Sequence, residues 1–147
     1  MKAKFKKLMK NQKGMTLIEL LAVIVIIAII ALIAIPAIAN VIQNSKDKAA
    51  LSDASQVVSA AKIAISDGAC GDADGTGAIS CEKSELQPFV DGLTLADGDK
   101  VVKAKNGSYS LVFARLQDID SSGKFKTAKP TNETTSIEYS VITGLMK

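Results

Sequence analysis

Hydrophobic residues fill one uninterrupted stretch near the N-terminus. From Leu20 to Ala39 the chain has no charged residue, and Pro36 is the single helix breaker in this stretch. Such a stretch rises about 30 Å as a helix, which matches the hydrocarbon core of a bilayer. Because it is apolar on every side, it predicts a helix that is surrounded by lipid or by other apolar helices.

The helix is predicted to continue beyond this stretch with a different pattern. There is no Gly between Met15 and Asp67, so helix-compatible sequence extends far past the apolar run, and Gly68 is placed to end it. Polar residues begin at Asn40. Apolar residues then recur three and four positions apart, which predicts an amphipathic helix with one face packed on a core. The stripe positions are Leu51, Ala54, Val58, Ala61 and Ile65.

The remainder of the chain predicts a small antiparallel sheet. Strands are expected at residues 101–103, 109–116 and 134–143, the last from its alternation of Ile137, Tyr139 and Val141. Asn106-Gly107 predicts a type I′ turn between the first two strands. The expected fold class is therefore α+β, a long N-terminal helix packed on a small antiparallel sheet.

A connection rich in Gly and Asp joins the helix to the sheet over residues 68–99. A short helix is predicted within it from Glu82 to Val90, capped by either Ser80 or Ser84.

The connection also holds the two cysteines of the chain, Cys70 and Cys81. If this part is exported, both lie in an oxidising space and are predicted to form a disulfide, worth roughly 3 kcal/mol. The alternative is two free buried thiols.

Charge is distributed unevenly. Six of the 18 Lys and Arg residues lie within residues 1–14, which contain no acid. This basic head suits the cytoplasmic side of a membrane. Without it the chain has 12 basic and 15 acidic residues, so bulk charge does not support nucleic acid as a primary ligand.

The residues that open the apolar stretch form a motif. The basic segment ends in Lys13-Gly14-Met15, and Glu19 follows four residues later. An acidic side chain at the centre of a membrane span costs about 2.5–3.5 kcal/mol, so intramembrane carboxylates generally have a function. From residue 1 to about residue 40, the chain resembles the class III signal of type IV pilins and pseudopilins.

The resemblance implies roles for individual residues. In that family a membrane peptidase cuts the leader between residues equivalent to Gly14 and Met15, and the new N-terminal residue is methylated. That residue is usually Phe, whereas this chain has Met. Glu19 takes the fifth mature position, the family's assembly determinant, and Pro36 takes mature position 22, where Pro is common. Lys13 would precede the cut.

Cleavage would place a free amine on Met15, one helical turn from Glu19. In the family, this carboxylate is thought to engage the terminal amine of the next subunit. Pairing would relieve the cost of a poorly solvated charge only when the subunits are correctly staggered. The alternative is a protonated Glu19 without a partner. Thr16 is predicted to cap the first turn of the mature helix.

The resemblance also implies an organisation and a function. Residues 1–14 would be a cleaved leader, residues 15–39 a transmembrane and filament-core helix, and residues 40–147 an extracytoplasmic head. The expected protein is a prepilin, held in the cytoplasmic membrane as a single-pass protein and polymerised into a surface filament for motility, adhesion or DNA uptake. The implied partners are the bilayer, prepilin peptidase, an assembly ATPase with its platform protein, and further copies of the chain.

Three alternatives share parts of this pattern. A pseudopilin of a type II secretion or competence machine would have the same N-terminus. A plain single-pass anchor would leave Glu19 unexplained. A secretory signal peptide cut after Ala37-Ile38-Ala39 would have an apolar run longer than the usual 7–15 residues.

Other candidate chemistry is sparse. The chain has no His, which removes the commonest general base and metal ligand, and we expect no enzymatic activity and no cofactor. Two loops resemble the first half of an EF-hand and give calcium candidates, but each has Lys at the twelfth position, where a bidentate Glu is required. Sequons at Asn106 and Asn132 match the glycosylation pattern. The calcium candidates are Asp72, Asp74, Asp118 and Asp120.

Overall fold

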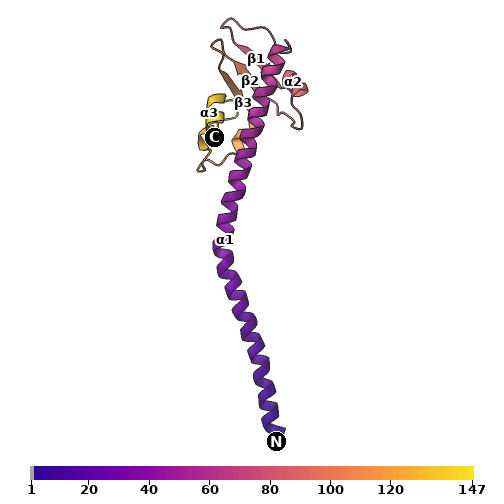
Figure 1. The fold of residues 1–147 in the computed structure, drawn as a ribbon, viewed down its shortest axis with the longest axis vertical. Coiled ribbons are helices and arrows are strands. Elements are labelled where there is room, and N and C mark those ends of the chain that lie inside the picture. The colour runs from indigo at the N-terminus through magenta and orange to yellow at the C-terminus, as the bar shows by residue number, and fades with distance from the viewer. Residues whose placement is uncertain (1) are drawn as a thin grey trace. The chain divides into compact units, whose positions relative to one another are not determined.

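The computed structural model describes the backbone of residues 2–147 and the side chains of residues 16–147. The chain divides into two compact units: residues 1–41, which we call the stem, and residues 42–147, which we call the head. Helix α1, Lys2–Ser66, supplies the stem and the first element of the head (Figure 1). The expected α+β fold class, a long helix with a small antiparallel sheet, is confirmed.

Helix α1 runs through Pro36 without ending. Proline removes one backbone donor and crowds the preceding turn, so it introduces a local irregularity into the helix. The helix nevertheless continues on both sides of it. Among the described residues, one helix is long and apolar enough to cross a membrane, and it is α1 from Thr16 onward.

The head is built on the amphipathic part of α1. Four of the five predicted stripe residues, from Leu51 to Ala61, are fully buried, and Ile65 is half-buried against the same core. Burial of a Leu or Val side chain stabilises a fold by about 1.5–3 kcal/mol, so this face provides much of the attachment between α1 and the sheet. The predicted amphipathic helix is confirmed.

Helix α1 ends at Ser66, and Gly68 terminates it as predicted. The Gly68 N–H donates to the Ile65 carbonyl at 3.2 Å, and the Ala69 N–H donates to the Ala64 carbonyl at 2.9 Å. This pair of bonds is a Schellman motif, which requires a left-handed residue at its centre. Gly68 supplies it with φ of 72°.

Four antiparallel strands form the sheet in the order β1-β2-β3-β4. Cys81, Val101, Leu111 and Ile137 are successive cross-strand partners. The first three are buried in the core shared with α1. The strands are β1 Ile79–Glu82, β2 Lys100–Lys103, β3 Tyr109–Val112 and β4 Ile137–Glu138.

The connection contains more structure than the sequence predicts. Strand β1 was not predicted, and the expected helix over residues 82–90 is instead α2, Lys83–Leu86, followed by the 3-10 helix η1, Gln87–Phe89. Neither predicted serine is the cap, because Ser80 lies in β1 and Ser84 inside α2. Glu82 is the cap residue, and its N–H donates to the Glu85 carboxylate at 2.9 Å.

The predicted β2–β3 hairpin is confirmed, but the predicted type I′ turn is wrong. The Gly107 N–H donates to the Ala104 carbonyl at 2.8 Å, and the Ala104 N–H donates to the Ser108 carbonyl at 2.9 Å. Gly107 has positive φ, and Asn106 does not. The loop therefore has three residues and a glycine bulge, whereas type I′ needs positive φ at both central residues.

The C-terminal part differs most from the prediction. Strand β3 gives way to the 3-10 helix η2, Ala114–Asp118, and a further short one, η3, spans Lys126–Ala128. The predicted strand over residues 134–143 is only the two-residue β4, followed by helix α3, Tyr139–Leu145. A helical path buries Ile142 completely.

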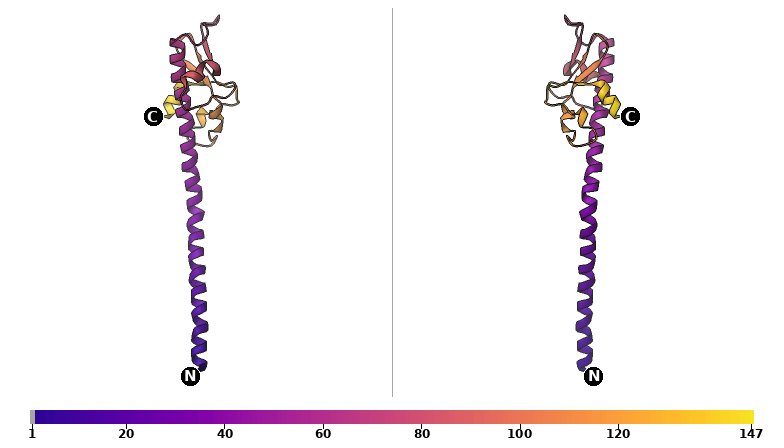
Figure 2. Two further views of the ribbon diagram at one scale, coloured as in Figure 1. Left: turned by 90° about the vertical axis from the view of Figure 1, so that its right-hand side faces the viewer. Right: turned by 90° about the vertical axis from the view of Figure 1, so that its left-hand side faces the viewer.

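Helix α3 lies beside the head part of α1 (Figure 2). The Tyr139 hydroxyl is 3.1 Å from the Ser55 hydroxyl of α1. The Lys62 ammonium, also on α1, lies 4.8 Å from the Tyr139 ring centroid and 5.3 Å from that of Tyr109. These cation–π contacts join α1, β3 and α3.

The Schellman motif gives a matched pair of stability variants. Gly68→Ala should lower the free energy of unfolding by about 1 kcal/mol, because a Cβ disfavours the left-handed conformation by about 1–2 kcal/mol. Gly71→Ala is the control, since Gly71 has no positive φ and neither site has an atom within 4 Å of an added Cβ. Denaturant unfolding of both variants measures the difference. Equal stabilities would contradict the conformational explanation.

Candidate functional site

The stem presents apolar side chains on all sides. From Leu17 to Val41 every Leu, Ile and Val is exposed, with fractions from 49% at Val25 to 76% at Leu32. A soluble monomer rarely exposes a continuous apolar surface larger than a few hundred Å². The stem therefore needs a covering of lipid or of other apolar helices.

Glu19 is the acidic residue within this apolar surface. Its side chain is exposed and lies among Leu17, Ile18 and Leu20, which are also exposed. When apolar groups cover the stem, this carboxylate loses water and needs a charged or hydrogen-bonding partner. The Glu19 carboxylate can therefore favour an arrangement in which one of the covering groups supplies such a partner.

The predicted processing residues lie at the edge of the described side chains. Lys13, Gly14 and Met15 lie outside the residues whose side chains are described, and their assigned roles stay predictions. Helix α1 passes through Thr16 without a terminus. A capping role for Thr16 can therefore arise only after cleavage creates a new helix end.

Cys70 and Cys81 form the predicted disulfide, with their α-carbons 5.0 Å apart. Both residues are buried, at 7% and 0% exposure. The bridge joins Cys70, four residues beyond the last residue of α1, to the core face of β1. It therefore restrains the long connection at the point where the connection enters the sheet.

The first predicted calcium loop uses its carboxylate within the loop. Asp74 Oδ1 accepts hydrogen bonds from the Thr76 N–H at 2.8 Å, from the Thr76 hydroxyl, and from the Ala78 N–H at 3.0 Å. The Thr76 hydroxyl, followed by these backbone donors, lowers the pKa of Asp74 below its usual value. Asp72 is exposed. These contacts describe a turn held by an aspartate.

The second predicted calcium loop is similar. Asp120 Oδ1 accepts from the Ser122 N–H and the Ser122 hydroxyl, both at 2.9 Å. The backbone donor and then the hydroxyl lower the pKa of Asp120. Across residues 16–147, no three His, Cys, Asp or Glu side chains converge on a point that could hold a metal.

Both sequons lie in comparable turns. Asn106 Oδ1 accepts from the Ser108 N–H at 3.0 Å, and Asn132 Oδ1 accepts from the Thr134 N–H at 3.2 Å. Both asparagines are exposed, and their modification stays a prediction.

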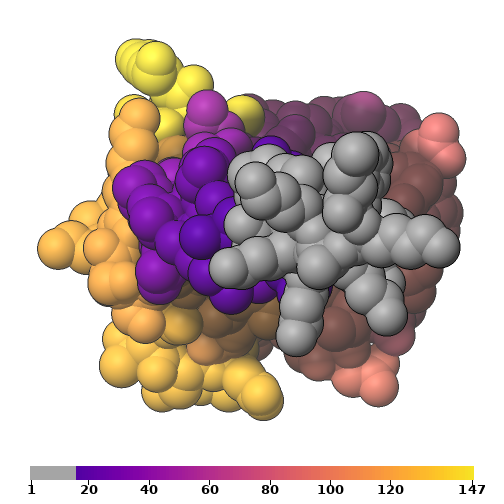
Figure 3. Space-filling model, turned by 90° about the horizontal axis from the view of Figure 1, so that it is seen from below, coloured from indigo at the N-terminus to yellow at the C-terminus, as the bar shows by residue number. Residues whose placement is uncertain are grey.

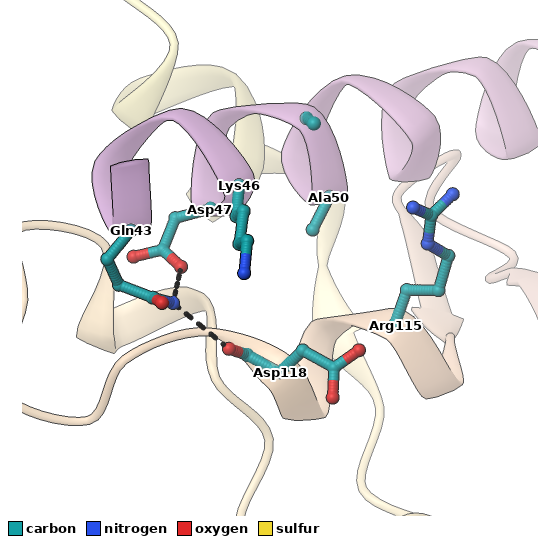
Figure 4. A pocket seen from close by; sticks show the side chains of 7 residues that line it. Gln43, Lys46, Asp47, Ala50, Arg115 and Asp118 are labelled. Atoms are coloured by element: carbon teal, nitrogen blue, oxygen red, sulfur yellow. Dashed lines mark hydrogen bonds between the residues drawn. The ribbon is translucent and has the colours of Figure 1, made fainter. Parts of the chain in front are cut away.

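A buried polar contact that the sequence did not predict lies where the second loop meets α1. Asp47 is 1% exposed, and its Oδ1 accepts from Gln43 Nε2 at 2.9 Å and from the Asp120 N–H at 3.4 Å. Gln43 Nε2 also donates to the Asp118 carbonyl at 3.4 Å (Figure 4). The amphipathic stripe contained the signal, because Asp47 lies four residues before Leu51 on the same face.

A polar hollow of about 470 Å³ lies between this part of α1 and η2. Lys46 and Arg115 line it together with Asp47 and Asp118, so its formal charges balance. Arg115 also forms an ion pair with Asp53 of α1. The Gln43–Asp118 hydrogen bond and the Arg115–Asp53 ion pair therefore join η2 to α1, and the hollow between them does not present a single sign of charge to a ligand.

Comparison with known proteins locates a family signal in the stem. The prokaryotic N-terminal methylation motif matches residues 9–35. The match includes every predicted processing residue and Glu19, and it ends one residue before Pro36. No curated protein and no solved structure matches the chain. The N-terminal segment is therefore a class III prepilin-type signal, the signal that type IV pilins and pseudopilins carry.

Proposed function

We propose that this protein is a prepilin that is stored as a single-pass protein of the cytoplasmic membrane and then polymerised into a type IV surface filament. The observation that carries the proposal is the methylation motif at residues 9–35, which lies on a helix whose apolar side chains are exposed on every side. Lipid covers this surface before assembly, and neighbouring stems cover it in the filament.

Processing follows from the signal. Prepilin peptidase cuts between Gly14 and Met15 and removes six lysines with the leader. The new amine of Met15 is then methylated. Loss of the leader also removes the charges that hold the N-terminus at the cytoplasmic surface, which frees the stem to leave the bilayer.

Assembly then depends on apolar packing and on one polar pair. The stem side chains pack against those of neighbouring copies, and the Glu19 carboxylate pairs with the terminal amine of an adjacent subunit. An assembly ATPase acting through a platform protein supplies the work of extraction. The head contributes a stable, disulfide-bonded outer surface and performs no catalysis.

The test is mass spectrometry of the intact chain and its N-terminal peptide, in membranes and in sheared surface material. We expect a chain that starts at methylated Met15, carries the Cys70–Cys81 bridge, and is enriched in the sheared fraction. A start at Asn40 would overturn the proposal in favour of a secreted protein. A mature chain confined to membranes would favour a pseudopilin role.

A further inference from the structure

A cluster of lysines lies at one end of the head, outside the signal and the polar hollow. Lys48 of α1, Lys124 of the loop before η3, and Lys147 line a hollow of about 220 Å³ together with Leu145 and Met146. We call these five residues the basic rim. Met146 is 50% exposed, and the C-terminal residues project at the edge of the head (Figure 3).

No rim lysine is paired with an acidic side chain among the described residues. The ion pairs of the described residues are Lys83–Asp97 and Arg115–Asp53, and neither involves a rim lysine. No acidic side chain lines the hollow. The rim therefore offers several cations beside an exposed apolar group, which is the combination that suits an anionic lipid surface.

The rim lies within reach of such a surface along the chain. Lys48 follows Ala39, the last residue of the apolar run, by nine residues, or about 14 Å of helix. The polar headgroup layer occupies about 5–8 Å of this distance. The remainder is close to the Debye length of about 8 Å, and lysine side chains extend toward lipid phosphates.

We propose that the head docks through the basic rim onto anionic lipid headgroups while the chain is stored in the membrane, and that it leaves them on assembly. This inference rests on the membrane-anchored state proposed above. Lys48 and Lys124 supply the attraction, and the exposed Met146 beside them faces the headgroup layer. A docked head keeps the stored subunit against the bilayer until extraction begins.

The experiment places a probe at the rim of the full-length chain. The two native cysteines are bridged, so Met146→Cys adds a single free thiol for an environment-sensitive fluorophore. The labelled chain is reconstituted in nanodiscs of phosphatidylcholine alone or mixed with phosphatidylglycerol. Quenching by acrylamide, a neutral quencher, reports exposure of the probe. We expect protection in the phosphatidylglycerol discs, and we expect high salt to remove it.

Charge variants assign the protection to the rim. Each lysine at an anionic surface should favour the docked head about fivefold, so Lys48→Gln with Lys124→Gln should lower the ratio of docked to undocked heads about 25-fold. Lys103→Gln with Lys105→Gln removes the same charge from the β2–β3 hairpin, and protection should persist. Loss of protection in both pairs would show a bulk charge effect and overturn the proposal.

The outcomes separate this proposal from the proposed function. A chain retained in discs whose probe is equally exposed in both lipids would overturn docking and leave the membrane-anchored state intact. A chain that is not retained in discs would overturn both. Protection that follows protein density and not lipid charge would assign the rim to a neighbouring copy and overturn lipid docking.

Discussion

Replacing Glu19 by Gln should abolish surface filaments while leaving the subunit in the membrane at its normal level. The change keeps the shape of the side chain and removes its charge, so the terminal amine of the adjacent subunit loses its partner in an apolar filament core. Removing one member of a buried ion pair costs about 3–5 kcal/mol, which corresponds to more than a hundredfold in each subunit contact. Immunoblots of sheared and membrane fractions measure the partition.

A matched variant controls for the loss of a carboxylate. Asp67→Asn makes the same chemical change at the exposed head end of α1, and its filaments should form normally. The mass of the membrane-bound Glu19→Gln chain should still show a start at Met15, which separates assembly from processing. Normal filaments from Glu19→Gln would mean that the carboxylate does not set the subunit stagger.

Removing the disulfide with Cys70→Ala and Cys81→Ala should lower the free energy of unfolding of the head by about 3 kcal/mol. The bridge closes a loop with a sequence separation of 11 residues and so lowers the conformational entropy of the unfolded chain. Removing the bridge restores that entropy, which favours the unfolded chain by this amount. Natural domains are stable by only about 5–15 kcal/mol, so the change is a large fraction of the total. Denaturant unfolding of the purified full-length chain measures it.

Reductant provides the control, because both sulfur atoms lie in the core and their replacement also changes packing. Reduced wild-type protein should unfold near the midpoint of the double variant, and reductant should leave the double variant unchanged. If reductant leaves the wild type equally stable, the bridge contributes nothing in solution. We also expect fewer intact filaments from the double variant, since the weakened head is open to proteolysis before assembly.

Sequence alone determined the features that depend on local pattern. The absence of Gly between Met15 and Asp67 and the apolar run from Leu20 to Ala39 predicted α1, because helix periodicity and composition are properties of neighbouring residues. The same holds for the Gly68 terminus and for the hairpin at Asn106. The prepilin-type signal was likewise readable, since its residues lie together in the chain. Pairing of the cysteines followed once export was assumed.

Tertiary structure decided the elements whose local signals were ambiguous. The alternation of Ile137, Tyr139 and Val141 is typical of a strand, yet Ile142 is buried only because residues 139–145 turn as a helix against the core. Strand β1 exists because it pairs with β2, although its sequence lies in a segment rich in Gly and Asp. Short elements of this kind gain little from propensity, so contacts with distant residues select their conformation.

Long-range packing also decided which polar residues are buried and which are clustered on one surface. Asp47 is buried because the loop at Asp120 folds back onto α1 and donates a backbone N–H to its carboxylate. The basic rim brings Lys48 and Lys124 together from positions far apart in the chain. A sequence lists such residues singly, whereas burial and clustered charge arise only when separate segments share one surface.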